Sequence, residues 1–235
     1  PEGMQIVPFY DRTDLVNAAM FNVAKVLIEG IILVVIVLFV FLGDVRSSLI
    51  VVATLILTPL ITFLTMNHYG ISANLMSLGG LAIAIGIMVD GSVVVVENTF
   101  AKLGERLRQG ESKNRIVLEA ATEVGTPVLF GVGIIILVFM PLLGLEGMEG
   151  KMFAPLALTI AIALTISLIL SFTLSPVMCS YILQGGAEHD TKLVAKLKQP
   201  YMQWLDWCLQ NPKVVVKRAL IGLGVSLVGF VLLGK

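Results

Sequence analysis

The chain contains few charged residues. Only 14% of its 235 residues are Asp, Glu, Lys or Arg, whereas 57% are hydrophobic, and the mean hydropathy is +0.96. Soluble globular domains carry about 25% charged residues, so this composition excludes that class. The same balance is typical of a membrane protein.

Cysteine and histidine are also scarce, with two residues of each. Cys179 and Cys208 form no spacing motif and lie near the ends of apolar segments, so we expect reduced thiols rather than metal ligands. His68 and His189 belong to no His/Cys cluster, and no phosphate-binding glycine loop is present. We therefore expect no cofactor and no ATPase activity.

Long apolar runs are abundant instead. Each is about 20 residues long, enough for a helix to cross a bilayer, whereas an outer-membrane barrel would show alternating segments of about 10 residues. The sequence therefore predicts an all-α transmembrane bundle with additional interfacial amphipathic helices. The six predicted spans are residues 23–42, 48–66, 75–96, 126–145, 152–174 and 214–233.

Basic residues are unevenly distributed between these spans. If the spans alternate in direction, Arg46 and the basic residues within 102–115 and 192–218 fall on one side of the membrane. The positive-inside rule makes that side cytoplasmic. The span 75–96 then runs from the outside inward. The chain lacks an initiator Met and stops just after an apolar run, so we expect it to be part of a longer protein.

Two polar segments between the spans have helical patterning. Residues 100–124, divided by Gly110, predict a cytoplasmic hairpin at the membrane surface, and residues 191–210 predict an interfacial helix anchored by Trp204 and Trp207. Pro127 is expected at the first position of the fourth span, where proline is best tolerated, with Thr126 as its N-cap.

The span 75–96 contains the most informative residue, Asp90. An ionised Asp at the centre of a membrane helix costs roughly 2.5 to 3.5 kcal/mol on insertion scales, so such residues usually carry ions or protons. Glu97 follows seven residues later and shares the same helical face, about 10 Å along the axis. The two carboxylates are our candidate proton-relay residues, and a carboxylate solvated at the cytoplasmic interface is the alternative role of Glu97.

The surroundings of Asp90 add two further expectations. Small residues such as Gly79, Gly80, Gly86 and Gly91 allow close packing by neighbouring helices, so we expect the span 75–96 at the bundle centre. An ionised Asp90 also needs a cationic partner, and no Lys or Arg of this chain lies at comparable depth.

Methionines are candidate metal contacts on the same helix. Thioethers suit soft ions such as Cu(I), which makes Met76 and Met88 candidate metal ligands. Methionine in an apolar helix more often serves as a packing residue, which is the alternative role of both side chains.

Two motifs on this helix resemble a known family. Residues 74–80 (NLMSLGG) and 86–98 (GIMVDGSVVVVEN) resemble the fourth transmembrane helix of resistance-nodulation-division (RND) exporters of the heavy-metal efflux subfamily. Residues 7–14, 41–46 and 145–155 resemble the segments that enter helix two, join helices two and three, and lead into helix six of those exporters.

The resemblance implies a division of the chain into parts of such a transporter. Residues 1–20 would end the periplasmic porter domain, and residues 21–183 would form transmembrane helices two to six, with a cytoplasmic segment at 98–125. Residues 184–212 would form a cytoplasmic link and amphipathic helix, and residues 213–235 helix seven.

The resemblance also implies a function. It predicts a non-enzymatic proton antiporter that exports heavy-metal cations, with Asp90 as the proton relay and Glu97 as its supporting acid. The full protein would be a homotrimer in the bacterial inner membrane, surrounded by lipid and working with a periplasmic adaptor and an outer-membrane channel. A basic residue from its second half would pair with Asp90, and no nucleic-acid partner is expected.

One position bears on the transported metal. Divalent-cation members carry a further Asp six residues before the relay position, where this chain has Ala84, as in copper and silver members. Ala84 therefore slightly favours Cu(I) or Ag(I) over divalent cations, whereas Gly91-Ser92 differs from the two alanines of the copper type, so both classes of metal stay open. The alternatives are a multidrug or protein-export relative and a membrane scaffold without transport. An intramembrane aspartyl protease is disfavoured, because it needs a second deep Asp to share a proton.

Overall fold

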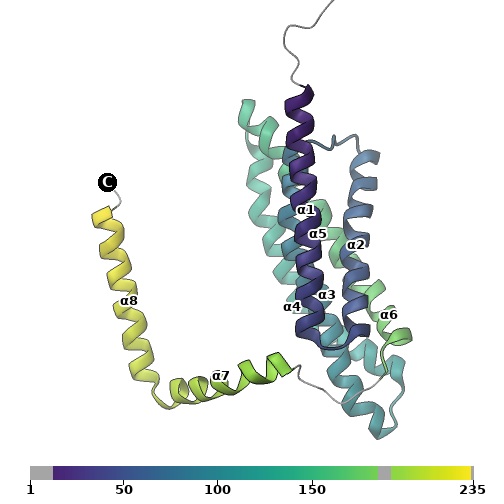
Figure 1. Cartoon of the computed structure of the whole chain (residues 1–235), viewed down its shortest axis with the longest axis vertical. Helices are drawn as coiled ribbons and strands as arrows, with labels where there is room; N and C mark the ends of the chain where they lie inside the picture. Colours follow the sequence, from purple (N-terminus) through teal and green to yellow (C-terminus); the bar gives the residue numbers. More distant parts are fainter. Residues whose placement is uncertain (1–12, 185–191, 234–235) are drawn as a thin grey trace, which may run out of the picture. The chain divides into compact units, whose positions relative to one another are not determined.

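The computed structural model describes residues 13–184 and 192–233, and these residues are mostly helical and include no strand. The chain forms two compact units, Pro1–His189 and Asp190–Lys235. The first unit contains the helices α1 to α6, which are drawn from purple to green in Figure 1. The second contains α7 and α8.

The predicted all-α membrane bundle is confirmed. Within the described residues, six helical segments are long and apolar enough to cross a membrane. The helices of the first unit are α1 Thr13–Leu42, α2 Val45–His68, α3 Leu75–Arg106, α4 Lys113–Phe139, α5 Gly147–Phe172 and α6 Leu174–Ile182, with short 3-10 turns η1 Leu107–Gln109 and η2 Met140–Gly144.

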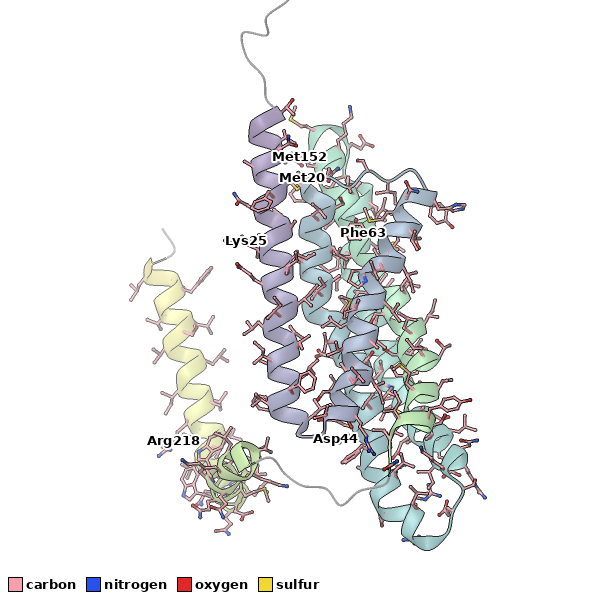
Figure 2. The ribbon with its side chains drawn as sticks, turned by 45° about the vertical axis from the view of Figure 1, so that its right-hand side comes forward. Met20, Lys25, Asp44, Phe63, Met152 and Arg218 are labelled. Carbon is pink, nitrogen blue, oxygen red and sulfur yellow. The ribbon has the colours of Figure 1, made fainter. Side chains whose placement is uncertain are left out.

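Helix α3 is the centre of the first unit. It packs against α1, α2, α4, α5 and α6, so the expectation of a central position is confirmed. The core around it consists of fully buried aliphatic side chains, among them Leu81, Ala84 and Val96 of α3 and Ile160 and Leu164 of α5. Many large apolar side chains on the outer faces of the bundle are exposed, as Figure 2 shows for the α1 side, and they form a surface suited to lipid.

Side-chain caps set the starts of two helices. Asp44, labelled in Figure 2 at the turn after α1, accepts a hydrogen bond from the Ser47 backbone N–H at 2.8 Å and so caps α2. Asn74 and Ser77 form a reciprocal capping box at the start of α3. Both caps satisfy backbone donors that the first turn of a helix leaves unpaired.

The predicted break before the fourth span is wrong. Helix α4 is continuous from Lys113, so Pro127 lies inside it and Thr126 is not an N-cap. Helix α3 likewise continues to Arg106, past the predicted end of its span. The polar segment 100–124 thus consists of the end of α3 and the start of α4, which are joined by η1 and Gly110. The φ angle of Gly110 is 81°, a left-handed conformation that glycine adopts readily. The predicted division at Gly110 is present.

The fifth span ends at a break between two helices. Helix α5 stops at Phe172, and α6 begins at Leu174, two residues before Pro176. Proline has no backbone N–H, and its ring clashes with the preceding helical turn. The backbone hydrogen bonds of α5 therefore do not continue through Pro176. Pro155, in contrast, lies inside α5.

The second unit consists of two helices. The amphipathic helix predicted at 191–210 is present as α7, Lys192–Gln210, and α8 spans Pro212–Leu233. The Arg218 guanidinium of α8 lies 5.4 Å from the Trp207 ring centroid of α7, a cation–π contact that joins the two helices.

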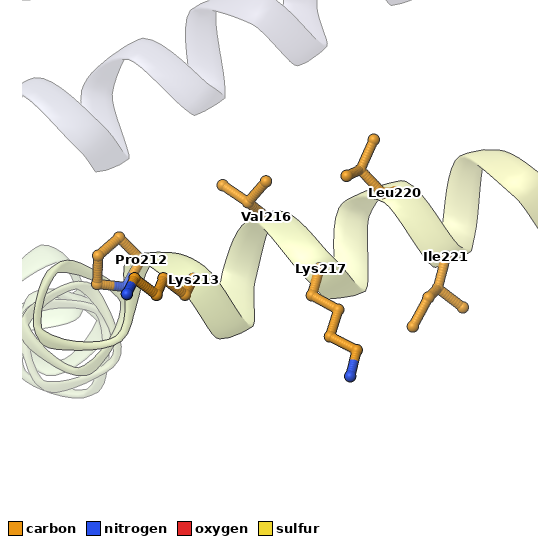
Figure 3. A pocket seen from close by; sticks show the side chains of 6 residues that line it. All are labelled: Pro212, Lys213, Val216, Lys217, Leu220 and Ile221. Atoms are coloured by element: carbon orange, nitrogen blue, oxygen red, sulfur yellow. The ribbon is translucent and has the colours of Figure 1, made fainter.

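A hollow of about 590 Å³ lies along α8 (Figure 3). The described residues that line it are Pro212, Lys213, Val216, Lys217, Leu220 and Ile221 of this helix. Ligand sites are concave and bury most of the ligand, which side chains along one helix do not achieve. We assign no ligand to this hollow.

Candidate functional site: the carboxylate face of α3

Asp90 and Glu97 line one hollow between α1 and α3. Its volume is about 390 Å³, and its walls include Val37 and Phe41 of α1 and Gly86 of α3. Apart from the two carboxylates and Gly86, the described residues that line it are aliphatic or aromatic. Both carboxylates are exposed within this chain. The seven-residue spacing that predicts a shared face therefore places both acids on one open, apolar groove.

Hydrogen bonds from α5 fix which way α3 is turned. The Ser167 hydroxyl donates to the Met88 carbonyl oxygen at 2.9 Å, and the hydroxyls of Ser92 and Ser171 lie 2.8 Å apart. These contacts are buried, and they come two residues before and two residues after Asp90 along α3. Positions 88 and 92 lie on one face of the helix, and position 90 lies on the opposite face. Because the contacts hold positions 88 and 92 against α5, Asp90 is turned toward the groove.

Two glycines allow this close approach. A Cβ atom added to Gly80 would lie 2.7 Å from the Leu156 carbonyl oxygen of α5. One added to Gly91 would lie 3.4 Å from the Ser171 hydroxyl oxygen of α5 and 3.3 Å from the Val128 Cγ1 atom of α4. Small residues at helix contacts are the usual means of bringing backbones together in membranes. Gly79 and Gly86 have open space where a Cβ would be, so they do not serve this contact.

The methionines lie apart from each other. Met88 is 3% exposed and belongs to the buried core, whereas Met76 is half-buried in the first turn of α3. Twelve helical residues separate them by about 18 Å, so they cannot share one ion. Among the described residues, no group of three or more His, Cys, Asp or Glu side chains could hold a metal.

The described part of the chain supplies no lysine or arginine to the groove. Lys25, labelled in Figure 2, lies on α1 and pairs with Glu29 at 3.8 Å, with both side chains more than 60% exposed. Asp90 therefore faces apolar side chains across an open groove, and a cation for its ionised form has to come from outside this set of residues.

Sequence reasoning missed the polar contacts between helices. The Ser92–Ser171 and Ser167–Met88 contacts join positions 79 residues apart in the chain. A group of ion pairs between the end of α3 and the start of α4 was also missed. The four-residue spacing of Ser167 and Ser171 on an apolar helix was the one available signal, because such serines share a face.

A bundle of membrane-length helices around one helix that carries two carboxylates defines a multi-pass membrane protein. The chain belongs to the AcrB/AcrD/AcrF family, which it matches over residues 1–235.

Curated relatives include metal-resistance proteins. The chain is 42% identical over 231 residues to the cobalt-zinc-cadmium resistance protein CzcA of Cupriavidus metallidurans, covering 95% of this chain and 21% of the relative. It is 38% identical over 192 residues to the cation efflux system protein CusA of Escherichia coli K12, covering 79% of this chain and 18% of the relative. The chain thus spans about a fifth of the length of these relatives.

A solved structure agrees with this membership. The crystal structure of a heavy metal efflux pump matches with a TM-score of 0.61 and 38% sequence identity, over 75% of this chain and 17% of that one. The resemblance to heavy-metal RND transporters that the sequence predicts is confirmed.

Proposed function

We propose that this chain contributes the proton-relay helix of a pump that exports heavy-metal cations against an inward flow of protons. The observation that carries the proposal is the groove in which Asp90 and Glu97 lie, on the central helix of the bundle. Intramembrane carboxylates are costly, and they are retained where they bind ions or protons. Similarity to metal-resistance proteins supplies the substrate class.

The groove explains how protonation could drive a conformational change. Ionised Asp90 favours a packing partner that carries a positive charge, whereas protonated Asp90 tolerates an apolar one. A ligand shifts a conformational equilibrium only by its difference in affinity for the two states, and here the proton is that ligand. The partner would be a basic side chain from another helix of the full-length protein, seated against the α1–α3 groove.

Glu97 would extend the relay. It follows Asp90 by seven residues, about 10 Å along the axis, and lines the same groove. With α3 directed from outside to inside, Glu97 is the acid nearer the cytoplasm. In this scheme it receives the proton that leaves Asp90 and passes it to the cytoplasmic side.

The proposed context is a homotrimer in the bacterial inner membrane. The N-terminal residues 1–20 would connect to a periplasmic domain, and residues 213–235 would continue the bundle as its seventh helix. A periplasmic adaptor and an outer-membrane channel would complete the export path, as expected from the family to which the chain belongs.

The transported ion is proposed to be Cu(I) or Ag(I). Ala84 is fully buried in the α3 core, so α3 offers no additional carboxylate for a divalent ion at this position. The thioethers of Met76 and Met88 are suited to a soft monovalent cation, and Met76, which is half-buried, is the more accessible of the two.

Growth of a metal-sensitive strain tests the proposal. The full-length protein would be expressed with Asp90→Asn, with Glu97→Gln or with the control Glu29→Gln, each checked for membrane insertion. Glu29 is also a carboxylate on an apolar helix, but it pairs locally with Lys25. We expect Asp90→Asn to abolish metal resistance, Glu97→Gln to reduce it and Glu29→Gln to leave it unchanged.

The same strains identify the metal. Separate challenge with Ag(I), Cu(I), Zn(II), Co(II) and Ni(II) should show protection against the monovalent ions. Full resistance with Asp90→Asn would refute the relay, and protection confined to the divalent ions would refute the proposed metal preference.

A further inference from the structure

The end of α3 beyond Glu97 carries three polar side chains that reach α4. They are Asn98, Lys102 and Arg106, spaced four residues apart and therefore on one face of the helix. Asn98 donates from Nδ2 to the Ala120 carbonyl oxygen at 2.8 Å. Lys102 pairs with Glu123 of α4.

Arg106 makes the most extensive contacts of the three. Its Nε and Nη2 bind the two oxygens of Glu111 at 3.0 and 2.5 Å, a bidentate pair that spans the turn. Its Nη1 binds Glu119 of α4 at 2.6 Å, and Glu119 also accepts a bond from Arg115. Arg106 thus ties α3, the turn and α4 together. We call Asn98, Lys102 and Arg106 with their α4 partners the α3–α4 clamp.

Next to the clamp residues, both helices carry completely buried side chains. They are Thr99 and Leu103 of α3 and Ile116 and Ala120 of α4. An isolated exposed ion pair contributes little to stability, but a network with bidentate geometry beside buried side chains holds a defined orientation. The α3–α4 hairpin is therefore built as a stiff unit.

The clamp begins directly after the relay carboxylates. Asn98 is the neighbour of Glu97, so its bond to Ala120 fixes the rotation of the turn that carries Glu97. Asp90 lies eight residues before Asn98, about 12 Å along the same helix. A rotation of the end of α3 released at the clamp would move Glu97 away from the groove and act against the α5 contacts that hold Asp90.

We propose that the α3–α4 clamp makes these two helices move as one body during transport, with Asn98, Lys102 and Arg106 as positioning residues for the relay acids. This inference rests on the proposed function, because it assigns the clamp a role in the same transport cycle. None of the three residues lines the groove.

Charge reversal and exchange test the clamp. The full-length protein would be reconstituted into vesicles with an imposed pH gradient, as wild type, Lys102→Glu, Glu123→Lys and the double exchange. Disturbing a coupling contact typically changes coupled function by roughly two- to thirtyfold. We expect each single reversal to lower the maximal transport rate within that range, with an unchanged half-saturating metal concentration. The double exchange should restore most of the rate.

A matched control and a cross-link separate positioning from folding. Arg115→Gln removes a pair to the same Glu119 within α4 alone, so it should leave transport unchanged. Lys102→Cys with Glu123→Cys, joined by a short bismaleimide in a background without other accessible cysteines, should also retain transport, because helices that move as one body tolerate a bridge.

The outcomes are distinguishable from failure of the proposed function. Loss of transport on cross-linking would overturn the one-body proposal even if the charge variants failed to insert. Wild-type rates in both single reversals would overturn it as well, provided that Asp90→Asn is inactive in the same vesicles. If Asp90→Asn remains active, the proposed relay itself is wrong.

Discussion

Replacing Gly80 by alanine should weaken the contact between α3 and α5, whereas the same change at the adjacent Gly79 should not. A Cβ at position 80 would lie 2.7 Å from the Leu156 carbonyl oxygen and 3.3 Å from its Cα atom. Both atoms belong to the backbone of α5, so no side-chain rotation relieves the contact. Because favourable carbon contacts lie at about 3.5–4.0 Å, the helices would have to separate.

The magnitude follows from comparing the two variants. Alanine is favoured over glycine within a helix by roughly 0.8–1.0 kcal/mol, and this gain is common to both positions. Overpacking a well-packed contact costs about 1–3 kcal/mol, and only Gly80→Ala incurs that cost. The difference between the variants is therefore about 1–3 kcal/mol in favour of Gly79→Ala, with Gly79→Ala at or above wild-type stability.

Thermal unfolding of the purified protein in detergent measures this difference. We expect the apparent melting temperatures to rank Gly79→Ala highest, wild type next and Gly80→Ala lowest. A Gly80→Ala protein as stable as Gly79→Ala would refute the close approach of α3 to α5, and with it the packing that turns Asp90 toward the groove.

Three further predictions concern the surroundings of the relay helix. Ser171→Ala leaves the buried Ser92 hydroxyl without its hydrogen-bond partner and should lower the free energy of unfolding by about 1 kcal/mol. Adding Ser92→Ala should cause little further loss of stability, and additive decreases in melting temperature would argue against the hydrogen bond. Asp44→Ala removes the N-cap of α2 and should lower the free energy of unfolding, measured by thermal unfolding, by roughly 0.5–2 kcal/mol. Asp44→Asn should retain most of the stability, and equal losses in both variants would contradict a capping role. Met76→Leu conserves volume and should lower growth in Ag(I) or Cu(I) selectively, since it removes a soft ligand without disturbing packing; unchanged growth would leave Met76 a packing residue.

The helix ends show what the sequence can predict. The ends at Leu42 and Leu233 and the starts at Leu75 and Pro212 agree with the prediction to within two residues, because apolar runs stop there and polar or turn residues follow. The end of α3 and the start of α4 were missed, since hydropathy marks where a helix leaves the bilayer and not where its hydrogen-bond ladder stops. Thr126-Pro127 resembles a helix start, yet α4 runs through it.

The sequence predicts which residues of the site share a face of α3, but not which residues of the other helices contact them. Helical periodicity places Asp90 and Glu97 on one face, and the structure shows them at one groove. Periodicity does not reveal that α1 forms the opposite wall or that Ser171 meets Ser92, because those contacts depend on how separate helices pack. The same holds for Lys102 and Glu123, whose pairing requires the turn at Gly110.

Proton flux in reconstituted vesicles tests the central claim most directly. The full-length protein would be reconstituted with a pH-sensitive dye inside, and Ag(I) or Cu(I) would be added to start transport. We expect metal-dependent proton movement with the wild-type protein and none with Asp90→Asn, while Glu29→Gln behaves as wild type. Metal-dependent proton movement at the wild-type rate in the Asp90→Asn protein would contradict the assignment of Asp90 as the relay.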